Sequence, residues 1–117
     1  MKSILSLSDG NLVYRTIGKR HAETIFFCHS LGANQSLWDR QIEQLSDSYH
    51  IVSCDLRGHG ESDIFTTPYS IEIFARDILT LLDHLDIFSF HFVGLSLGSM
   101  IGLWLSSNSS NRVKRLS

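Results

Sequence analysis

The feature that most constrains the fold of this chain is a G-x-S-x-G pattern, in which Ser96 stands between Gly94 and Gly98. The pattern is typical of a strand that enters a helix through a turn so tight that the serine lies at its apex. Apolar residues supply that context, since 90–93 predict a buried strand and 97–107 predict an apolar helix. The glycines follow from this geometry, because a Cβ at either position would collide with the neighbouring strand or the incoming helix.

Two earlier segments repeat the organisation of an apolar strand followed by a polar loop. Residues 24–28 predict a buried strand that ends in a His-Ser-Leu-Gly loop at 29–32, before a helix at 36–45. Residues 51–54 predict a further strand, which runs into the loop Asp-Leu-Arg-Gly-His-Gly-Glu-Ser at 55–62. Loops at these strand ends lie where a parallel sheet of an α/β protein binds its ligands.

Taken together, the three segments give the chain a resemblance to the α/β-hydrolase superfamily that extends from residue 3 to the last residue. Within it, the loops at 29–32 and 55–62 and the Tyr-Ser-Ile-Glu run at 69–72 are most similar to the 3-oxoadipate enol-lactonases. The resemblance implies a serine hydrolase that acts on an ester or lactone. A carboxylesterase or a haloperoxidase-like α/β hydrolase is the alternative.

The resemblance also gives single residues a role. Ser96 is the expected nucleophile, raised on the turn that is called the nucleophile elbow. The backbone N–H groups of Leu31 and Leu97 are the expected oxyanion hole, because both are placed to reach the point above Ser96 where a carbonyl oxygen acquires negative charge. No metal or organic cofactor is implied, and the expected partner is a small-molecule substrate.

The rest of the chain predicts the layers of this fold. Strands at 3–7 and 12–17, joined through Asp9 and Gly10, predict an N-terminal hairpin. Strands and helices then alternate, which indicates a mostly parallel sheet with helices on both faces. The best-formed helix spans 70–85, and its apolar residues make one stripe: Ile71, Phe74, Ala75, Ile78, Leu82 and Leu85.

One part of the implied chemistry is missing from the chain. In this superfamily the acid and the histidine follow the serine, yet residues 97–117 contain no Asp, Glu or His, and all six histidines precede Ser96. We therefore expect residues 1–117 to be a partial α/β-hydrolase domain, its N-terminal portion, truncated after the nucleophile helix as residues 111–116 enter the next strand. Without the C-terminal strands, cap, acid and histidine, the chain alone is expected to be inactive. The alternative is that it is a complete, non-catalytic remnant.

Charge and composition argue against several other classes of function. Ten basic and twelve acidic residues give a net charge of −2 with no run of like charge. The sequence therefore has no basic patch that would bind nucleic acid or an anionic membrane. No segment reaches the roughly 18 apolar residues of a membrane span, and the N-terminal apolar stretch is too short for a signal peptide. The chain is therefore expected to be cytoplasmic, while its oligomeric state stays open. Cys28 and Cys54 are expected to be reduced, buried thiols.

Two histidines in the strand-end loops allow two interpretations. His29 and His59 could each contact substrate, or each could hydrogen-bond to the loop backbone and hold its shape. The second interpretation is favoured. Asp55 and Arg57 are likewise expected to fix the loop at 55–62 through side-chain contacts.

Overall fold

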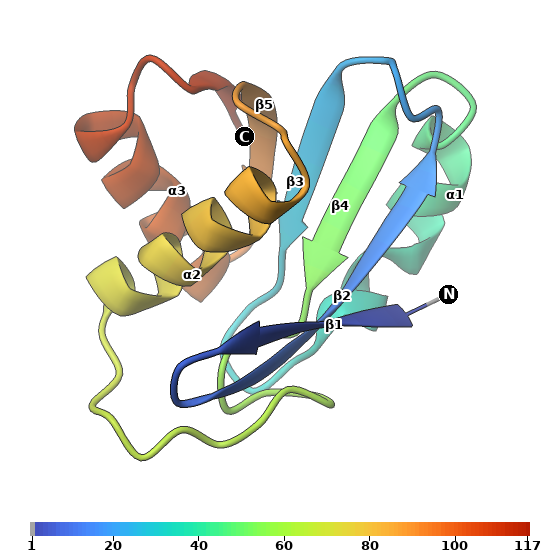
Figure 1. The fold of residues 1–117 in the computed structure, drawn as a ribbon. Coiled ribbons are helices and arrows are strands. Elements are labelled where there is room, and N and C mark those ends of the chain that lie inside the picture. The colour runs from blue at the N-terminus through green and yellow to red at the C-terminus, as the bar shows by residue number, and fades with distance from the viewer. Residues whose placement is uncertain (1) are drawn as a thin grey trace.

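The computed structural model describes residues 2–117 and contains one sheet with helices on both of its faces (Figure 1). Within these residues six strands lie in the order β1-β2-β4-β3-β5-β6. Every predicted strand is present, and so are the predicted helices, although the one expected at 36–45 is divided in two. Along the chain the elements are β1 (Lys2–Leu7), β2 (Gly10–Gly18), β3 (Thr24–Cys28), the 3-10 helix η1 (Gln35–Trp38), α1 (Asp39–Leu45), β4 (His50–Cys54), α2 (Ile71–His84), β5 (Phe90–Gly94), α3 (Leu97–Asn108) and β6 (Val113–Leu116).

The sheet changes from antiparallel to parallel pairing at β4. The pairs β1–β2 and β2–β4 are antiparallel, whereas β4, β3, β5 and β6 pair in parallel. The N-terminal hairpin is confirmed, but its turn is formed by Ser8 and Asp9, and Gly10 is already the first residue of β2. Gly10 serves packing rather than the turn, because a Cβ there would lie 2.9 Å from the ring of Phe65.

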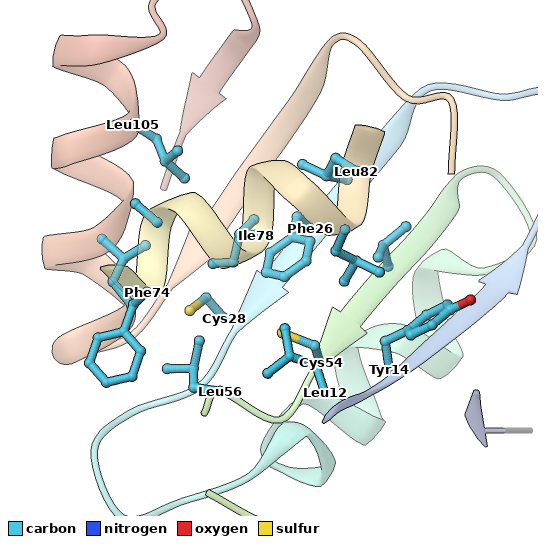
Figure 2. Packing of buried hydrophobic residues seen from close by; sticks show 14 of the residues in the cluster. Leu12, Tyr14, Phe26, Cys28, Cys54, Leu56, Phe74, Ile78, Leu82 and Leu105 are labelled. Carbon is cyan, nitrogen blue, oxygen red and sulfur yellow. The ribbon is translucent and has the colours of Figure 1, made fainter. Parts of the chain in front are cut away.

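Helices α2 and α3 cover one face of the sheet and α1 covers the other, as predicted (Figure 1). Successive strand residues point to opposite faces, so Phe26 packs under α2 and α3 while Phe27 packs under α1. Figure 2 shows Phe26 and Ile78 between strand β3 and helix α2. Both faces are buried, which explains why β3 reads as a continuous apolar run rather than an alternating one.

The two cysteines lie in the larger of these two cores. Cys28 ends β3 and Cys54 ends the adjacent strand β4, and both side chains are free and buried (Figure 2). Burial raises the pKa of both thiols, because a thiolate is poorly solvated in an apolar interior. Each therefore acts as a small hydrophobic side chain of the core.

Helix α2 has clear start and stop signals. The Ser70 side chain accepts a hydrogen bond from the Ile73 N–H at 3.1 Å, and Glu72 adds negative charge to the first turn. The helix ends before Asp86, whose φ of 58° lies in the left-handed region. One buried position departs from the apolar stripe, because Asp77 faces the protein interior.

The single helix expected at 36–45 is divided into η1 and α1. The side chain of Asn34 caps η1, and Trp38, with ψ of 7°, separates it from α1. The reason is a tertiary contact, since the buried Gln35 is held against β4 by a hydrogen bond from the Ser53 hydroxyl at 2.7 Å. This hydrogen bond favours the tight 3-10 turn of η1, which helical periodicity in the sequence does not predict.

Residues 111–116 lead into a strand, as expected, and β6 pairs in parallel with β5. Helix α3 packs closely on this part of the sheet. A Cβ on Gly102 would lie 2.8 Å from the ring of Phe92 in β5, so the glycine permits the close approach of helix to strand.

A buried ion pair joins the loop after β4 to helix α2. The guanidinium group of Arg57 donates two hydrogen bonds to the carboxylate of Asp77, at 2.6 and 2.8 Å, and both side chains are buried. The same guanidinium lies over the ring of Phe65, 4.0 Å from its centroid. The expectation that Arg57 fixes the loop is confirmed, and the pair explains the acidic residue on the buried face of α2.

Replacement of Asp77 by Ala is expected to lower the free energy of unfolding by about 3–5 kcal/mol, because it removes the carboxylate that accepts two hydrogen bonds from the buried guanidinium. The contacts of Arg57 with Thr67 and, at 3.6 Å, with the Asp9 carboxylate remain. The matched control is Glu72→Ala, which breaks an exposed pair with Arg76 on the same helix and is expected to change stability by less than about 1 kcal/mol. Urea unfolding of the two variants measures both values. Similar small losses in both would contradict a structural role for the buried pair.

Candidate active site

The loops that follow β3, β4 and β5 meet at one edge of the sheet, because these three strands are parallel. The arrows of β3 and β4 in Figure 1 point toward this edge. Helix α3 starts directly against the end of β3, where the Leu95 N–H donates to the Cys28 carbonyl at 3.4 Å. Ser96 and the loop at 29–34 are therefore neighbours, although they are far apart in the sequence.

The turn between β5 and α3 has the strained geometry that its pattern predicts. Ser96 has φ 56° and ψ −112°, a conformation that residues with a side chain seldom adopt. A Cβ on Gly98 would lie 3.0 Å from the carbonyl oxygen of His29 and still closer to that of Cys28, and a Cβ on Gly94 would overlap the backbone of Gly98. Both glycines are thus required by close backbone approach, and the turn presents an exposed serine at its apex.

Two backbone donors are open beside this turn. Leu97 is the first residue of α3, so its N–H has no acceptor within the helix. In the described residues 2–117 the N–H of Leu31 makes no hydrogen bond either, and its side chain is 72% exposed. These are the two donors expected from the sequence. Leu31 lies on the loop after β3 and Leu97 at the start of α3, at the same sheet edge as Ser96.

The conformation of the loop at 29–34 is set by Gly32. Its φ is 76°, and the Ala33 N–H donates to the Ser30 carbonyl at 3.1 Å. A glycine with positive φ at the third position, closed by this hydrogen bond, is the pattern of a type II turn. Leu31 is the second residue of that turn, so its backbone orientation depends on how the turn is held.

His29 and His59 hold loop backbone, which confirms the favoured interpretation. His29 is fully buried, with Nδ1 2.7 Å from the Ser30 carbonyl oxygen and Nε2 accepting the Leu56 N–H at 3.0 Å. Nδ1 of His59 lies 3.1 Å from the Arg57 carbonyl. Burial lowers the pKa of His29, because the imidazolium ion would be poorly solvated there, and the Ser30 carbonyl only partly offsets this.

Asp55 joins the two loops, as expected of a residue that fixes the second one. One carboxylate oxygen accepts the Gln35 N–H at 2.8 Å and the other accepts the Glu61 N–H at 2.9 Å. Gly60, with φ 51°, allows the backbone to pass directly over this carboxylate. Asp55 is 1% exposed, so these hydrogen bonds replace the water that its charge loses on burial.

Three contributors to this arrangement were not predicted as such. Gln35 and Ser62 are buried polar side chains, and the Ser62 hydroxyl donates to the Asp55 carbonyl while it accepts the Val13 N–H. Asp77 pairs with Arg57 as described above. The only sign of them in the sequence is a polar residue at a position where an apolar one is expected. Asp77, within the apolar stripe of α2, is an example.

The Ser96 hydroxyl makes no hydrogen bond within residues 2–117. His29, on the neighbouring loop, is not available to the serine, because both of its ring nitrogens contact backbone groups. His50 and His91 lie close to Thr24 and Glu23 instead. Within the described residues the site therefore combines an exposed serine with two open N–H donors, without a side-chain base bound to the serine.

In the described part of the chain, metal-binding groups, membrane-spanning helices or other cavities would indicate a different kind of site. Residues 2–117 contain no group of three or more His, Cys, Asp or Glu side chains that could hold a metal ion. None of their helices has the length and apolar character needed to cross a membrane. An open groove of about 640 Å³ lies between α1 and β6, lined in part by Tyr49, His91 and Lys114, and Ser96 is not among its lining residues.

Comparisons with known proteins agree with this architecture. The family model described as alpha/beta hydrolase fold matches residues 23–116. The chain is 36% identical over 115 residues to 3-oxoadipate enol-lactonase 2 of Acinetobacter baylyi, a match that covers 98% of this chain and 43% of the relative. It is 32% identical over 96 residues to a non-heme chloroperoxidase of Streptomyces lividans, covering 80% of this chain and 35% of the relative.

A solved structure gives the same result in three dimensions. The enol-lactonase from Burkholderia xenovorans superposes with a TM-score of 0.92 at 35% sequence identity, covering 97% of this chain and 45% of that one. The chain thus spans less than half the length of the relatives it matches.

The backbone strain at Ser96 predicts that position 96 accepts glycine better than alanine. Ser96→Gly is expected to make the protein more stable than Ser96→Ala by about 1 kcal/mol. The relief of about 1–3 kcal/mol of backbone strain exceeds the roughly 0.4–1 kcal/mol that glycine costs through the unfolded chain. Urea unfolding of the two variants measures the difference. A glycine variant less stable than the alanine variant would show that the turn is not strained.

Proposed function

The chain belongs to the α/β-hydrolase family, and from this premise we propose that it supplies the nucleophile and the oxyanion hole of a hydrolase that cleaves an ester or lactone. The nucleophile is Ser96, and the oxyanion donors are the backbone N–H groups of Leu31 and Leu97. The observation that carries the proposal is an exposed serine at φ 56°, held between two close-packed glycines and beside two open N–H donors. A polar residue has no folding advantage in such a conformation.

The reaction begins when the Ser96 Oγ attacks the carbonyl carbon of the substrate. A bond forms between Oγ and that carbon, and the carbonyl oxygen becomes an oxyanion that accepts hydrogen bonds from Leu31 and Leu97. The C–O bond of the ester or lactone then breaks, and the oxygen that leaves takes up a proton. Water hydrolyses the resulting serine ester and restores the Ser96 hydroxyl.

Proton transfer requires groups that we place after Ser117. A serine hydroxyl is a weak nucleophile until an adjacent base takes its proton, and in this family the acid and the histidine follow the serine in the chain. We propose that residues 1–117 form the N-terminal portion of the hydrolase domain, and that the acid, the histidine and the remaining strands are supplied by polypeptide beyond it. The chain alone is then inactive. A non-catalytic remnant of the domain is the competing hypothesis.

An enol-lactone is the substrate that we propose first. The support is the 36% identity to 3-oxoadipate enol-lactonase 2 over 98% of the chain, together with the similar fold of an enol-lactonase of known structure. The similarity to a chloroperoxidase makes a haloperoxidase-like or carboxylesterase activity the second candidate. A panel that contains 3-oxoadipate enol-lactone and small aryl esters separates these candidates by their kcat/KM.

Replacement of Ser96 by Ala, in a form of the protein that extends past Ser117, is expected to reduce turnover of the preferred substrate by a factor of order 10⁶, because the covalent route is lost. Steady-state assays of lactone or ester hydrolysis measure the effect. The control is Ser107→Ala, an exposed serine on the same helix, which leaves the rate unchanged. An alanine variant at position 96 with a near-normal rate would contradict the assignment of the nucleophile.

Two substitutions at Leu31 separate its backbone from its side chain. Leu31→Ala keeps the N–H and is expected to be mild, whereas Leu31→Pro removes the donor and is expected to lower kcat by about 10²–10³. Proline suits the second position of a type II turn, so the loop keeps its shape. Equal losses of kcat in the two variants would mean that Leu31 acts through packing rather than through its N–H.

A further inference from the structure

We propose that His29 is a positioning residue, whose two ring nitrogens hold the turn that presents the Leu31 N–H to the oxyanion. This inference rests on the proposed function, since it concerns the same site. It differs from a role in substrate binding, because the His29 side chain is fully buried behind the loop. It differs also from general core packing, because each ring nitrogen has a specific backbone partner.

The first contact fixes the start of the turn. Nδ1 of His29 lies 2.7 Å from the carbonyl oxygen of Ser30. The same carbonyl accepts the Ala33 N–H at 3.1 Å and so closes the turn in which Leu31 is the second residue. The imidazole therefore holds the acceptor on which the turn closes, and this carbonyl belongs to the same planar peptide group as the Leu31 N–H that the reaction uses.

The second contact determines the form of the imidazole. The Leu56 N–H can only donate, so Nε2 of His29, at 3.0 Å, must accept and carries no proton. The proton of the neutral ring is then on Nδ1, where it is donated to the Ser30 carbonyl. Both contacts exist together only in this one neutral tautomer, since the imidazolium ion has no acceptor nitrogen for Leu56.

The far end of the same loop is held by the residue next to Leu56. The Gln35 N–H donates to the Asp55 carboxylate at 2.8 Å. Asp55 and Leu56 directly follow β4, which ends at Cys54, so one short segment beyond the neighbouring strand fixes both ends of the loop at 29–35. If His29 is lost, the loop keeps its attachment at Gln35 and loses the attachment nearer to Leu31.

The surroundings of His29 favour the neutral ring. The ring of His59, on the loop after β4, lies 5.1 Å from it and opposes a second positive charge. The carboxylate of Asp55 acts in the opposite direction. Burial has the largest effect, and the pKa of His29 is lowered from its ordinary value near 6.5. The neutral ring, and with it both contacts, therefore persists to a lower pH than it would if His29 kept its ordinary pKa.

Two substitutions separate the two contacts. In His29→Asn the amide reaches the position of Nδ1 and still donates to Ser30, but no acceptor reaches Leu56. In His29→Gln the longer side chain places an amide oxygen near the position of Nε2, where it accepts the Leu56 N–H.

We expect the Asn variant to lower kcat by about 10–100-fold with little change in KM, as for a reacting group misplaced by about 1 Å. Gln is expected to restore part of the loss, because it keeps the Leu56 contact, which ties the loop to the segment after β4, but not the contact with Ser30. His21→Asn, on an exposed histidine, is the matched control and keeps the wild-type rate.

The second measurement does not need activity. Nitrogen-15 NMR of the wild-type protein at neutral pH is expected to show His29 as the neutral tautomer with its proton on Nδ1, and the Leu56 amide as slowly exchanging. Amide exchange at Leu56 is expected to be slow in the Gln variant and fast in the Asn variant. These spectra are recorded in the same extended protein that is used for the assays.

The outcomes separate this inference from the proposed function. A proton on Nε2 in the wild type, or equal kcat for the Asn and Gln variants, would overturn the positioning role of His29. A loss of kcat that is matched by an equal loss of folded protein would also overturn it, because the effect would then be one of stability. Expected spectra in a wild-type protein that hydrolyses no ester or lactone would count against the proposed function, while the attachment of the loop by His29 would stand.

Discussion

The close approach of helix α3 to the end of strand β3 is the constraint on which the rest of the site depends. Position 98 meets the carbonyl groups of Cys28 and His29 so closely that only glycine fits. This contact brings the first turn of α3, with the open N–H of Leu97, next to the loop that leaves β3. The strained φ of Ser96 follows from it, because the chain must reverse direction within the two residues between β5 and the helix. The packed sheet around the turn holds this strain in place.

Buried polar groups, rather than apolar contacts, then fix the loops at the sheet edge. Asp55 is almost fully buried and accepts backbone N–H groups from the first residue of η1 and from the loop after β4. The buried pair of Arg57 and Asp77 attaches the second loop to α2. An unpartnered buried charge would be costly, so each of these side chains specifies one arrangement of its loop. Apolar packing alone tolerates small shifts of a loop, whereas the proposed oxyanion hole requires two N–H groups that stay directed at one oxygen.

The sequence predicts the layers of this fold well, because these depend on local patterns. The strands, the stripe of α2 and the serine turn are all visible as apolar periodicity or as glycine spacing. The division of the helix at 36–45 was not predicted, since it depends on Gln35 meeting Ser53, a contact between separate segments. The pairing of Asp77 with Arg57 is of the same kind. Polar contacts between segments leave no periodic trace, so the roles of His29 and Asp55 were predicted in general terms but their partners were not.

The proposed catalytic groups are of two kinds, those positioned by the backbone and those that depend on side-chain contacts. The nucleophile and the two oxyanion donors are placed by backbone geometry, through a glycine contact, a type II turn and a helix start, all within residues 29–98. Proton transfer depends instead on side chains that must reach Ser96, and in the described residues its hydroxyl has no such partner. Backbone donors retain catalytic value without a base, because the stabilised oxyanion and substrate binding account for a residual rate of roughly 10³–10⁴ over water in serine hydrolases that lack their triad. The oxyanion hole proposed at the sheet edge would therefore stabilise charge independently of the groups that move the proton, so the proposed positioning role of His29 and the identity of the base are separate physical questions.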